Sequence, residues 1–192
     1  QHDSLRATIV WSVSLLAPEQ ARLLALVSVF ASDFSVDDAQ RVLGGAFDAQ
    51  ALPAMLRTLL DRHLLTRLDD GGQGAPGRFA LADAVREHAQ GVAPALPQWA
   101  PARAAHAERV NEVVAAAAEQ VRAGQSRPAH ATYRAIVADI EPALSWQREH
   151  ADRLPYLRAC WQAAGLHGTY GAMRLAIDCL QDATAIAPQG RD

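Results

Sequence analysis

The chain has 192 residues, a net charge of −3 and a hydrophobic content of 50%, which fits one large or two small globular domains rich in helix. The acidic balance argues against a protein that binds nucleic acid without sequence preference, since such proteins need an excess of basic residues to neutralise phosphates. All 18 basic residues are arginine, which excludes chemistry that requires a lysine, such as a Schiff base or a P-loop phosphate contact.

The cysteine content and the hydropathy pattern favour a cytoplasmic location. The two cysteines, Cys160 and Cys179, are too few for a disulfide scaffold, so a reducing compartment is expected. No apolar run approaches the ~20 residues that a membrane span needs, and no signal peptide precedes the first elements. Because the sequence begins with Gln1, we expect it to be a fragment of a longer protein.

The N-terminal part of the chain predicts two helices in succession. Residues 4 to 16 carry an apolar stripe at helical spacing, with Ser4 as the candidate N-cap. Pro18 is then well placed in the first turn of a second helix. The dense apolar run that follows Pro18 predicts that this second helix is central to the core.

Two further helices are marked by their first residues. Ser35, with Asp38 three positions later, is the pattern of a capping box, and Gly44 and Gly45 are expected to end the helix that it begins. The next apolar face belongs to the segment AQALPAMLRTLLDRH. Its Pro53 must lie in the first turn, because a proline further inside would break the helix.

The spacing of apolar residues then changes to a strand-like alternation. Residues 64 to 82 contain two short alternating segments on either side of the turn cluster GGQGAPG, which predicts one two-stranded β-hairpin. Several helices followed by such a hairpin give the element order of a winged-helix domain. The second strand runs directly into the helix DAVREHAQGV, where Asp83 is the predicted N-cap.

A proline-rich stretch suggests how the chain divides into domains. Residues 94 to 101 contain three prolines and predict a linker. The predicted fold is therefore mainly α: a winged-helix domain at residues 1–93, a linker at 94–101 and an α-helical, TPR-like or solenoid-like domain at 102–192.

The C-terminal domain is expected to consist of antiparallel helices. Asp139 and Pro142 predict a break within residues 130 to 150. The last two helices are joined at a Gly-Thr-Tyr-Gly turn, with Cys160 and Cys179 at similar heights on either side. These thiols are either a redox-sensitive pair or small apolar residues that allow close packing, and packing is the favoured interpretation.

Catalytic and metal-binding patterns are not found. The histidines are scattered, and no HExxH, CxxC or GxSxG motif accompanies them. We therefore expect no catalytic residue and no metal site in this chain, and the chain is not expected to be an enzyme.

Four segments, in order, resemble the winged-helix part of bacterial STAND-type NTPase regulators, the AfsR- and LuxR-like large transcriptional activators. The segments are LRATIVWSVSLLAPEQARLLALVSVFASDFSVDDAQRVLG, LPAMLRTLLDRHLLTRLDD, RFALADAVREHA and DIEPALSWQREHAD. The resemblance implies a regulatory, non-catalytic module in signal transduction. Its winged helix would pack on a nucleotide-binding domain of the parent chain, and its helical domain would receive an unknown protein or small-molecule signal.

The same resemblance bears on nucleotide binding. In related NB-ARC proteins a Met-His-Asp motif stands at the strand-to-helix junction, and its histidine approaches the phosphates of ADP. Leu81, Ala82 and Asp83 match that motif by position, so Ala82 replaces the histidine while Asp83 is retained. The resemblance thus implies ATP or ADP for the parent chain and no cofactor held by this part of it.

A free-standing DNA-binding winged helix with a helical dimerisation tail is the alternative. Its DNA-facing residues would be Arg57, Arg62, His63 and Arg78, from the third helix and the wing. Residues 35 to 90, however, contain six arginines and eight carboxylates, and a groove-reading domain is normally positive there. Protein packing is therefore favoured over DNA binding.

Overall fold

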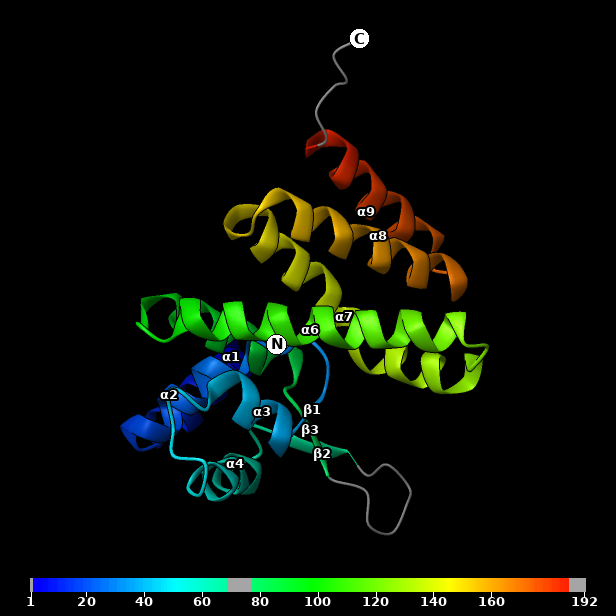
Figure 1. Cartoon of the computed structure of the whole chain (residues 1–192). Coiled ribbons are helices and arrows are strands. Elements are labelled where there is room, and N and C mark those ends of the chain that lie inside the picture. Colours follow the sequence, from blue (N-terminus) through cyan, green and yellow to red (C-terminus); the bar gives the residue numbers. More distant parts are fainter. Residues whose placement is uncertain (1, 69–76, 187–192) are drawn as a thin grey trace. The chain divides into compact units, whose positions relative to one another are not determined.

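The computed structural model describes residues 2–68 and 77–186 and is mainly helical. The chain forms two compact units, Gln1–His106 and Ala107–Asp192, and the boundary in the sequence between them falls within the helix of residues Trp99–Arg122. Figure 1 follows the elements in chain order. Among the described residues, no helix is long and apolar enough to cross a membrane. The tip of the predicted hairpin falls mostly in residues 69–76, outside the described residues.

The first unit contains five α-helices among its described residues, together with a small sheet. The elements are α1 (His2–Ser14), α2 (Pro18–Val27), β1 (Phe34–Ser35), α3 (Val36–Leu43), α4 (Leu52–Asp61), β2 (Thr66–Leu68), β3 (Arg78–Ala80), α5 (Asp83–Val92) and a 3₁₀ turn, η1 (Ala93–Ala95). The stretch predicted as a linker therefore begins with this 3₁₀ turn, and its last residues lie in the first turn of the next helix, α6 (Trp99–Arg122).

Several helix boundaries follow the predicted signals. Pro18 is the first residue of α2, and Pro53 lies in the first turn of α4. Ser35 caps α3: its Oγ accepts from the amide of Asp38 at 3.1 Å, and the Asp38 carboxylate accepts from the Ser35 amide at 2.9 Å. The predicted capping box is thus confirmed. The prediction for Ser4 was wrong, because α1 already begins at His2.

The predicted hairpin is present, but its sheet has a third strand. β2 and β3 pair antiparallel, and β1 pairs with the other edge of β3, so the strand order is β1-β3-β2. Phe34 stands opposite Phe79, and Ser35 opposite Arg78. The prediction of a two-stranded sheet was therefore wrong: a strand of two residues has no alternation of its own, so only its pairing with β3 reveals it.

Arg78 fixes the added strand in place. Its guanidinium donates to both carboxylate oxygens of Asp33, at 3.0 and 3.3 Å, and to the Asp33 carbonyl at 2.7 Å. The same guanidinium lies 3.9 Å from the Asp38 carboxylate in the first turn of α3. One side chain on β3 thereby connects the residue before β1 with the start of α3.

The core of the first unit is centred on α2. Leu23 and Leu26 of this helix are fully buried, and so is Phe30 shortly after it. The rings of Phe30 and Phe34 stack with centroids 4.6 Å apart. A hydrogen bond also connects α5 with the segment that follows α2, because the guanidinium of Arg86 donates to the Phe30 carbonyl at 3.2 Å.

The second unit contains the rest of α6 and three further helices of the described chain: α7 (Ser126–His150), α8 (Arg153–Thr169) and α9 (Met173–Ile186). The hairpin of α8 and α9 around the Gly-Thr-Tyr-Gly turn agrees with the prediction. The predicted break near Asp139 was wrong, since α7 continues through Pro142 without interruption.

Candidate functional site

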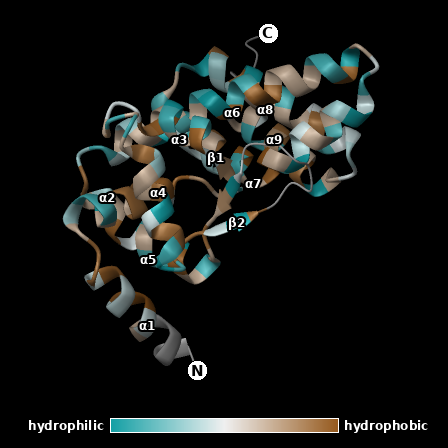
Figure 2. Cartoon of the chain, turned by 90° about the horizontal axis from the view of Figure 1, so that it is seen from below, coloured by the Kyte–Doolittle hydropathy of each residue, from teal (hydrophilic) through white to brown (hydrophobic). Residues whose placement is uncertain are grey.

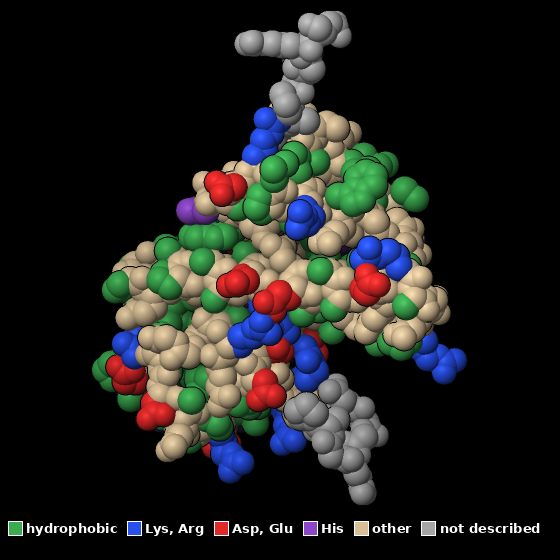
Figure 3. All heavy atoms as spheres, in the orientation of Figure 1, with side chains coloured by type: hydrophobic (Ala, Val, Ile, Leu, Met, Phe, Trp, Pro, Cys, Tyr) green, Lys and Arg blue, Asp and Glu red, His purple; other side chains and the backbone are tan. Residues whose placement is uncertain are grey.

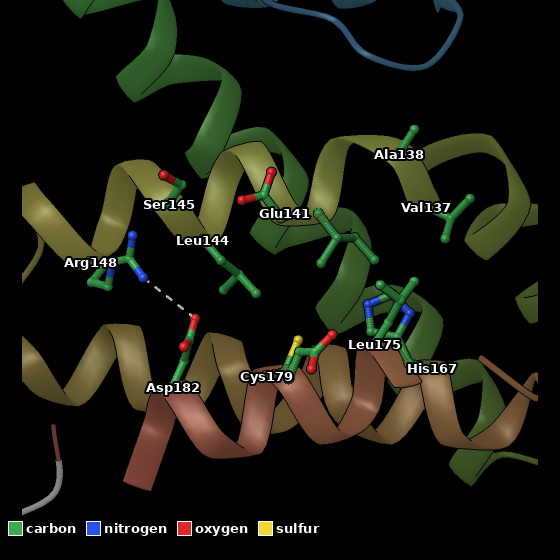
Figure 4. Close-up of a pocket in the computed structure, with 12 residues that line it drawn as sticks. Val137, Ala138, Glu141, Leu144, Ser145, Arg148, His167, Leu175, Cys179 and Asp182 are labelled. Carbon is green, nitrogen blue, oxygen red and sulfur yellow. Dashed lines mark ion pairs between the residues drawn. The ribbon is translucent and has the colours of Figure 1, made fainter. Parts of the chain in front are cut away.

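The second unit contains a cavity of about 360 Å³ between α7, α8 and α9. This volume lies in the range of small-molecule sites in proteins. Figure 4 shows the cavity between α7 and α9. Its lining is mostly apolar with a minority of polar groups: Val137, Ala138, Ile140, Glu141, Leu144, Ser145, Arg148, His167, Leu175, Asp178, Cys179 and Asp182.

Helical periodicity explains why these residues share one cavity. On α7, Ala138, Glu141, Ser145 and Arg148 follow one another at intervals of three or four positions, so they form one stripe along the helix. The lining residues of α9, from Leu175 to Asp182, form a matching stripe by the same rule. His167 lies on α8, near the turn into α9.

One end of the cavity is closed by an ion pair. The guanidinium of Arg148 on α7 lies 3.7 Å from the carboxylate of Asp182 on α9, and Figure 4 shows this pair at the end opposite His167. Both side chains are about half exposed, 48% and 53%. The pair therefore contributes little to the stability of the fold, at most about 1 kcal/mol. It does, however, pair the one arginine of the lining with a carboxylate of the protein.

The carboxylates of the lining differ in their partners. Asp178 is 3.3 Å from Arg174 one turn earlier on α9, and Asp182 is paired with Arg148. Glu141 makes no hydrogen bond or ion pair with any residue that the structure describes. The lining thus has one carboxylate whose charge no protein cation balances.

At its other end the cavity is bordered by a buried pair of polar rings. The hydroxyl of Tyr133 and Nδ1 of His167 are 2.8 Å apart, and His167 is only 2% exposed. Burial lowers the pKa of His167 below its usual 6.5. Burial, and to a smaller extent Cys179, raises the pKa of Tyr133. Both rings are therefore neutral near pH 7, and they share one hydrogen bond whose direction depends on the tautomer of His167.

Cys179 contributes a protonated thiol to the lining. Its burial, together with the nearby Cys160, Asp182 and Asp178, raises its pKa to about 11. Cys160 is also buried, and neither cysteine is in a disulfide. Since the thiolate is the reactive form, the raised pKa lowers the reactivity of Cys179 near neutral pH. The interpretation of the two thiols as packing residues stays a prediction.

The buried imidazole predicts a pH-dependent stability. In the folded chain His167 resists protonation, whereas the unfolded chain takes up a proton near pH 6.5. The His167 contribution is therefore fully present above pH 6.5 and is lost as the pH falls below it, by at most about 1.4 kcal/mol per pH unit. We expect urea titrations of His167→Gln between pH 7.5 and pH 5 to show a smaller loss of stability than the parent chain. Equal slopes for His167→Gln and the parent chain would contradict the prediction.

The four arginine and histidine positions of the DNA-binding alternative differ in their exposure and partners. Arg57, Arg62 and His63 are exposed along and just after α4. His63 has a φ of 57°, the left-handed conformation of a residue that ends a helix. Arg78 is instead half-buried and held by Asp33 and Asp38.

The predicted cap at the strand-to-helix junction was wrong. Ala82 is the N-cap residue of α5, and no side chain caps this helix. Asp83 is the first helical residue, fully exposed, and its carboxylate lies 2.9 Å from Arg86. The junction is held by Arg86, which also donates to the carbonyls of Leu81 and Phe30. Asp83 therefore favours α5 through its charge near the helix N-terminus and its ion pair, rather than by accepting amide hydrogen bonds.

The cavity was not predicted from the sequence. Its residues come from three helices and span positions 137 to 182, so no local motif joins them. One signal was present: His167 lies in a helix rich in alanine and leucine, and a histidine buried in such a helix needs a polar partner. Within the described parts of the chain, no three His, Cys, Asp or Glu residues come together as metal ligands.

Comparison of the chain with protein-family models, with curated proteins and with solved structures finds no match.

Proposed function

We propose that this chain is a non-catalytic regulatory and interaction module of a STAND-type NTPase transcriptional regulator. In this proposal the first unit is a winged helix that packs on the nucleotide-binding domain of the parent chain. The second unit is a TPR-like sensor that receives the signal. ATP or ADP is bound by the parent chain, outside the 192 residues considered.

The order of elements in the first unit supports the winged-helix assignment. Helix α2, strand β1, helices α3 and α4, and the hairpin β2–β3 follow one another in the order of that fold, and the sheet order β1-β3-β2 agrees with it. In the second unit, α8 and α9 span positions 153 to 186, which is the 34-residue length of a TPR helix pair. This length supports the TPR-like assignment.

The observation that carries the proposal is the exposed apolar face of α1. Ile9 on one side of this helix packs into the core, as does Leu16 just after the helix ends. The other side leaves Val10 and Trp11 exposed, Trp11 to 64%, and Leu15 directly after the helix is exposed too. Figure 2 shows hydrophobic residues along α1. A tryptophan with aliphatic neighbours on a surface is typical of a protein interface. This face of α1 is the proposed docking surface for the nucleotide-binding domain.

DNA binding remains the second candidate because Arg57, Arg62 and His63 are exposed at α4, the third helix of the winged-helix order. Two observations disfavour it. Arg78 of the wing is engaged by two carboxylates. On the face seen in Figure 3, arginine and acidic side chains are interspersed rather than separated into a basic patch.

A binding experiment on the α1 face tests the proposal. The chain and its Trp11→Ser variant are titrated against the nucleotide-binding domain of the parent protein in a calorimeter. Trp161→Ser is the matched control, since Trp161 is also exposed, at 72%, but lies in the second unit. We expect W11S to weaken binding at least tenfold, which corresponds to about 1.4 kcal/mol or more, and W161S to leave it unchanged.

A mobility-shift titration with mixed-sequence DNA at low and high salt separates the two candidates. The proposal predicts no shift for the chain at either salt concentration. A salt-dependent shift that Arg57→Ala and Arg62→Ala both weaken, together with no binding of the nucleotide-binding domain, would establish the DNA-binding alternative instead.

A further inference from the structure

We propose that the cavity between α7, α8 and α9 binds a small organic cation, an amine with an apolar body, with Glu141 as its counter-ion. The inference deepens the sensing role assigned to the second unit and rests on that proposed function for its biological meaning. The binding itself depends on this unit alone, because all the lining residues lie within Ala107–Asp192.

The size of the cavity and its aliphatic walls favour a ligand with an apolar part. Val137, Ile140, Leu144 and Leu175 provide aliphatic surface on α7 and α9. A cavity of about 360 Å³ is large enough for a ligand of several carbon atoms, and the burial of its apolar surface drives binding. A small, fully hydrated ion would leave these walls uncovered.

The charge of the lining selects the head group. Three carboxylates and one arginine line the cavity, and two of those carboxylates already have an arginine partner. Glu141 has none among the described residues. An ammonium group beside Glu141 would balance its charge with a charge-assisted hydrogen bond, whereas a carboxylate or phosphate ligand would be repelled.

The imidazole of His167 adds a directional polar contact. Its Nδ1 is engaged by Tyr133, while Nε2 makes no hydrogen bond to a described residue. The neutral ring does not repel a cation as an imidazolium would, and Nε2 can hydrogen-bond a second polar group of the ligand. At the opposite end of the cavity, the Arg148–Asp182 pair holds the only lining arginine away from the head group.

Three ligands of equal length test the head-group preference. Hexylamine, hexanol and hexanoate are titrated separately into the full chain, and binding is followed by ligand-observed NMR and by the chemical shifts of His167. We expect saturable binding of hexylamine that displaces the His167 signals, weaker binding of hexanol, and the weakest binding of hexanoate. An amine that binds no tighter than the alcohol would overturn the proposal, as would the absence of saturable binding by all three ligands.

Two glutamate variants test the role of Glu141. Glu141→Gln keeps the size of an exposed side chain and should fold normally, which circular dichroism checks. We expect it to weaken hexylamine about tenfold and to leave hexanol unchanged. Glu108→Gln, an exposed glutamate on α6 outside the cavity lining, is the matched control and should change neither ligand. Equal hexylamine affinity in E141Q and the parent chain would overturn the assignment.

The outcome is separable from that of the docking experiment. W11S should weaken binding of the nucleotide-binding domain and leave hexylamine binding unchanged, while E141Q should weaken hexylamine binding and leave binding of the domain unchanged. Amine binding without docking would refute the proposed function alone, and docking without amine binding would refute the cavity proposal alone.

Discussion

Replacing Phe34 with alanine is expected to lower the free energy of unfolding of the first unit by about 3–5 kcal/mol, the range for truncation of a buried aromatic residue. Phe34 is fully buried, and its ring stacks on Phe30 with centroids 4.6 Å apart. It is also one of the two residues of β1, where it stands opposite Phe79. The variant therefore loses the apolar burial, the ring stacking and the side chain that orients the added strand.

Urea unfolding followed by circular dichroism measures this loss. Leu68→Ala on β2 is the control, because Leu68 is already 38% exposed and should cost less than about 1 kcal/mol. Phe34→Leu keeps most of the apolar volume and should fall between the two. A Phe34→Ala variant within 1 kcal/mol of the parent would show that β1 contributes little to the stability of this unit.

The contrast between β1 and the hairpin shows which information the sequence contains. The hairpin was predictable because two alternating segments flank a cluster of glycines, and these signals are local. β1 has two residues, and the second of them, Ser35, is also the cap of α3. Its strand conformation depends on hydrogen bonds to β3, more than forty positions later in the chain, so no local pattern could predict it.

Helix α7 shows how packing outweighs a local signal. Pro142 lacks an amide donor and crowds the preceding turn, which costs about 3 kcal/mol inside a helix. On the same helix, Ile136, Ile140 and Ala143 are buried in the core of the second unit. Burial of the two isoleucine side chains contributes about 3–6 kcal/mol, enough to offset the proline and keep the helix continuous.

The candidate cavity could be predicted only in part for a related reason. The turn between α8 and α9 predicts that these two helices pack as an antiparallel pair. The proximity of His167 to α9 could therefore be predicted from the sequence. The approach of α7, which brings Glu141 and Tyr133, depends on side-chain packing between elements that share no local motif. The spacing of apolar residues predicts which face of each helix is buried, but it does not predict which helices pack against each other.

Removal of the Arg78 guanidinium is the second large effect expected. Arg78 and Asp33 have side chains only 20% and 22% exposed, and three hydrogen bonds join the guanidinium to Asp33. Arg78→Ala leaves the carboxylates of Asp33 and Asp38 half-buried without this cation. We expect a loss of about 2–3 kcal/mol, somewhat less than the cost of breaking a fully buried pair because water reaches this one.

A double-mutant cycle isolates the pair. Arg78→Ala, Asp33→Asn and the double variant are unfolded in urea, and the coupling energy should be about 1–2 kcal/mol in favour of the pair. Arg57→Ala, an exposed arginine on α4, is the control and should change stability by less than about 0.5 kcal/mol. The cycle also bears on function, since an arginine needed to hold the sheet is not available to read a DNA groove. A coupling energy near zero would mean that Arg78 is free to leave Asp33, and the wing would then regain a cation for the DNA-binding alternative.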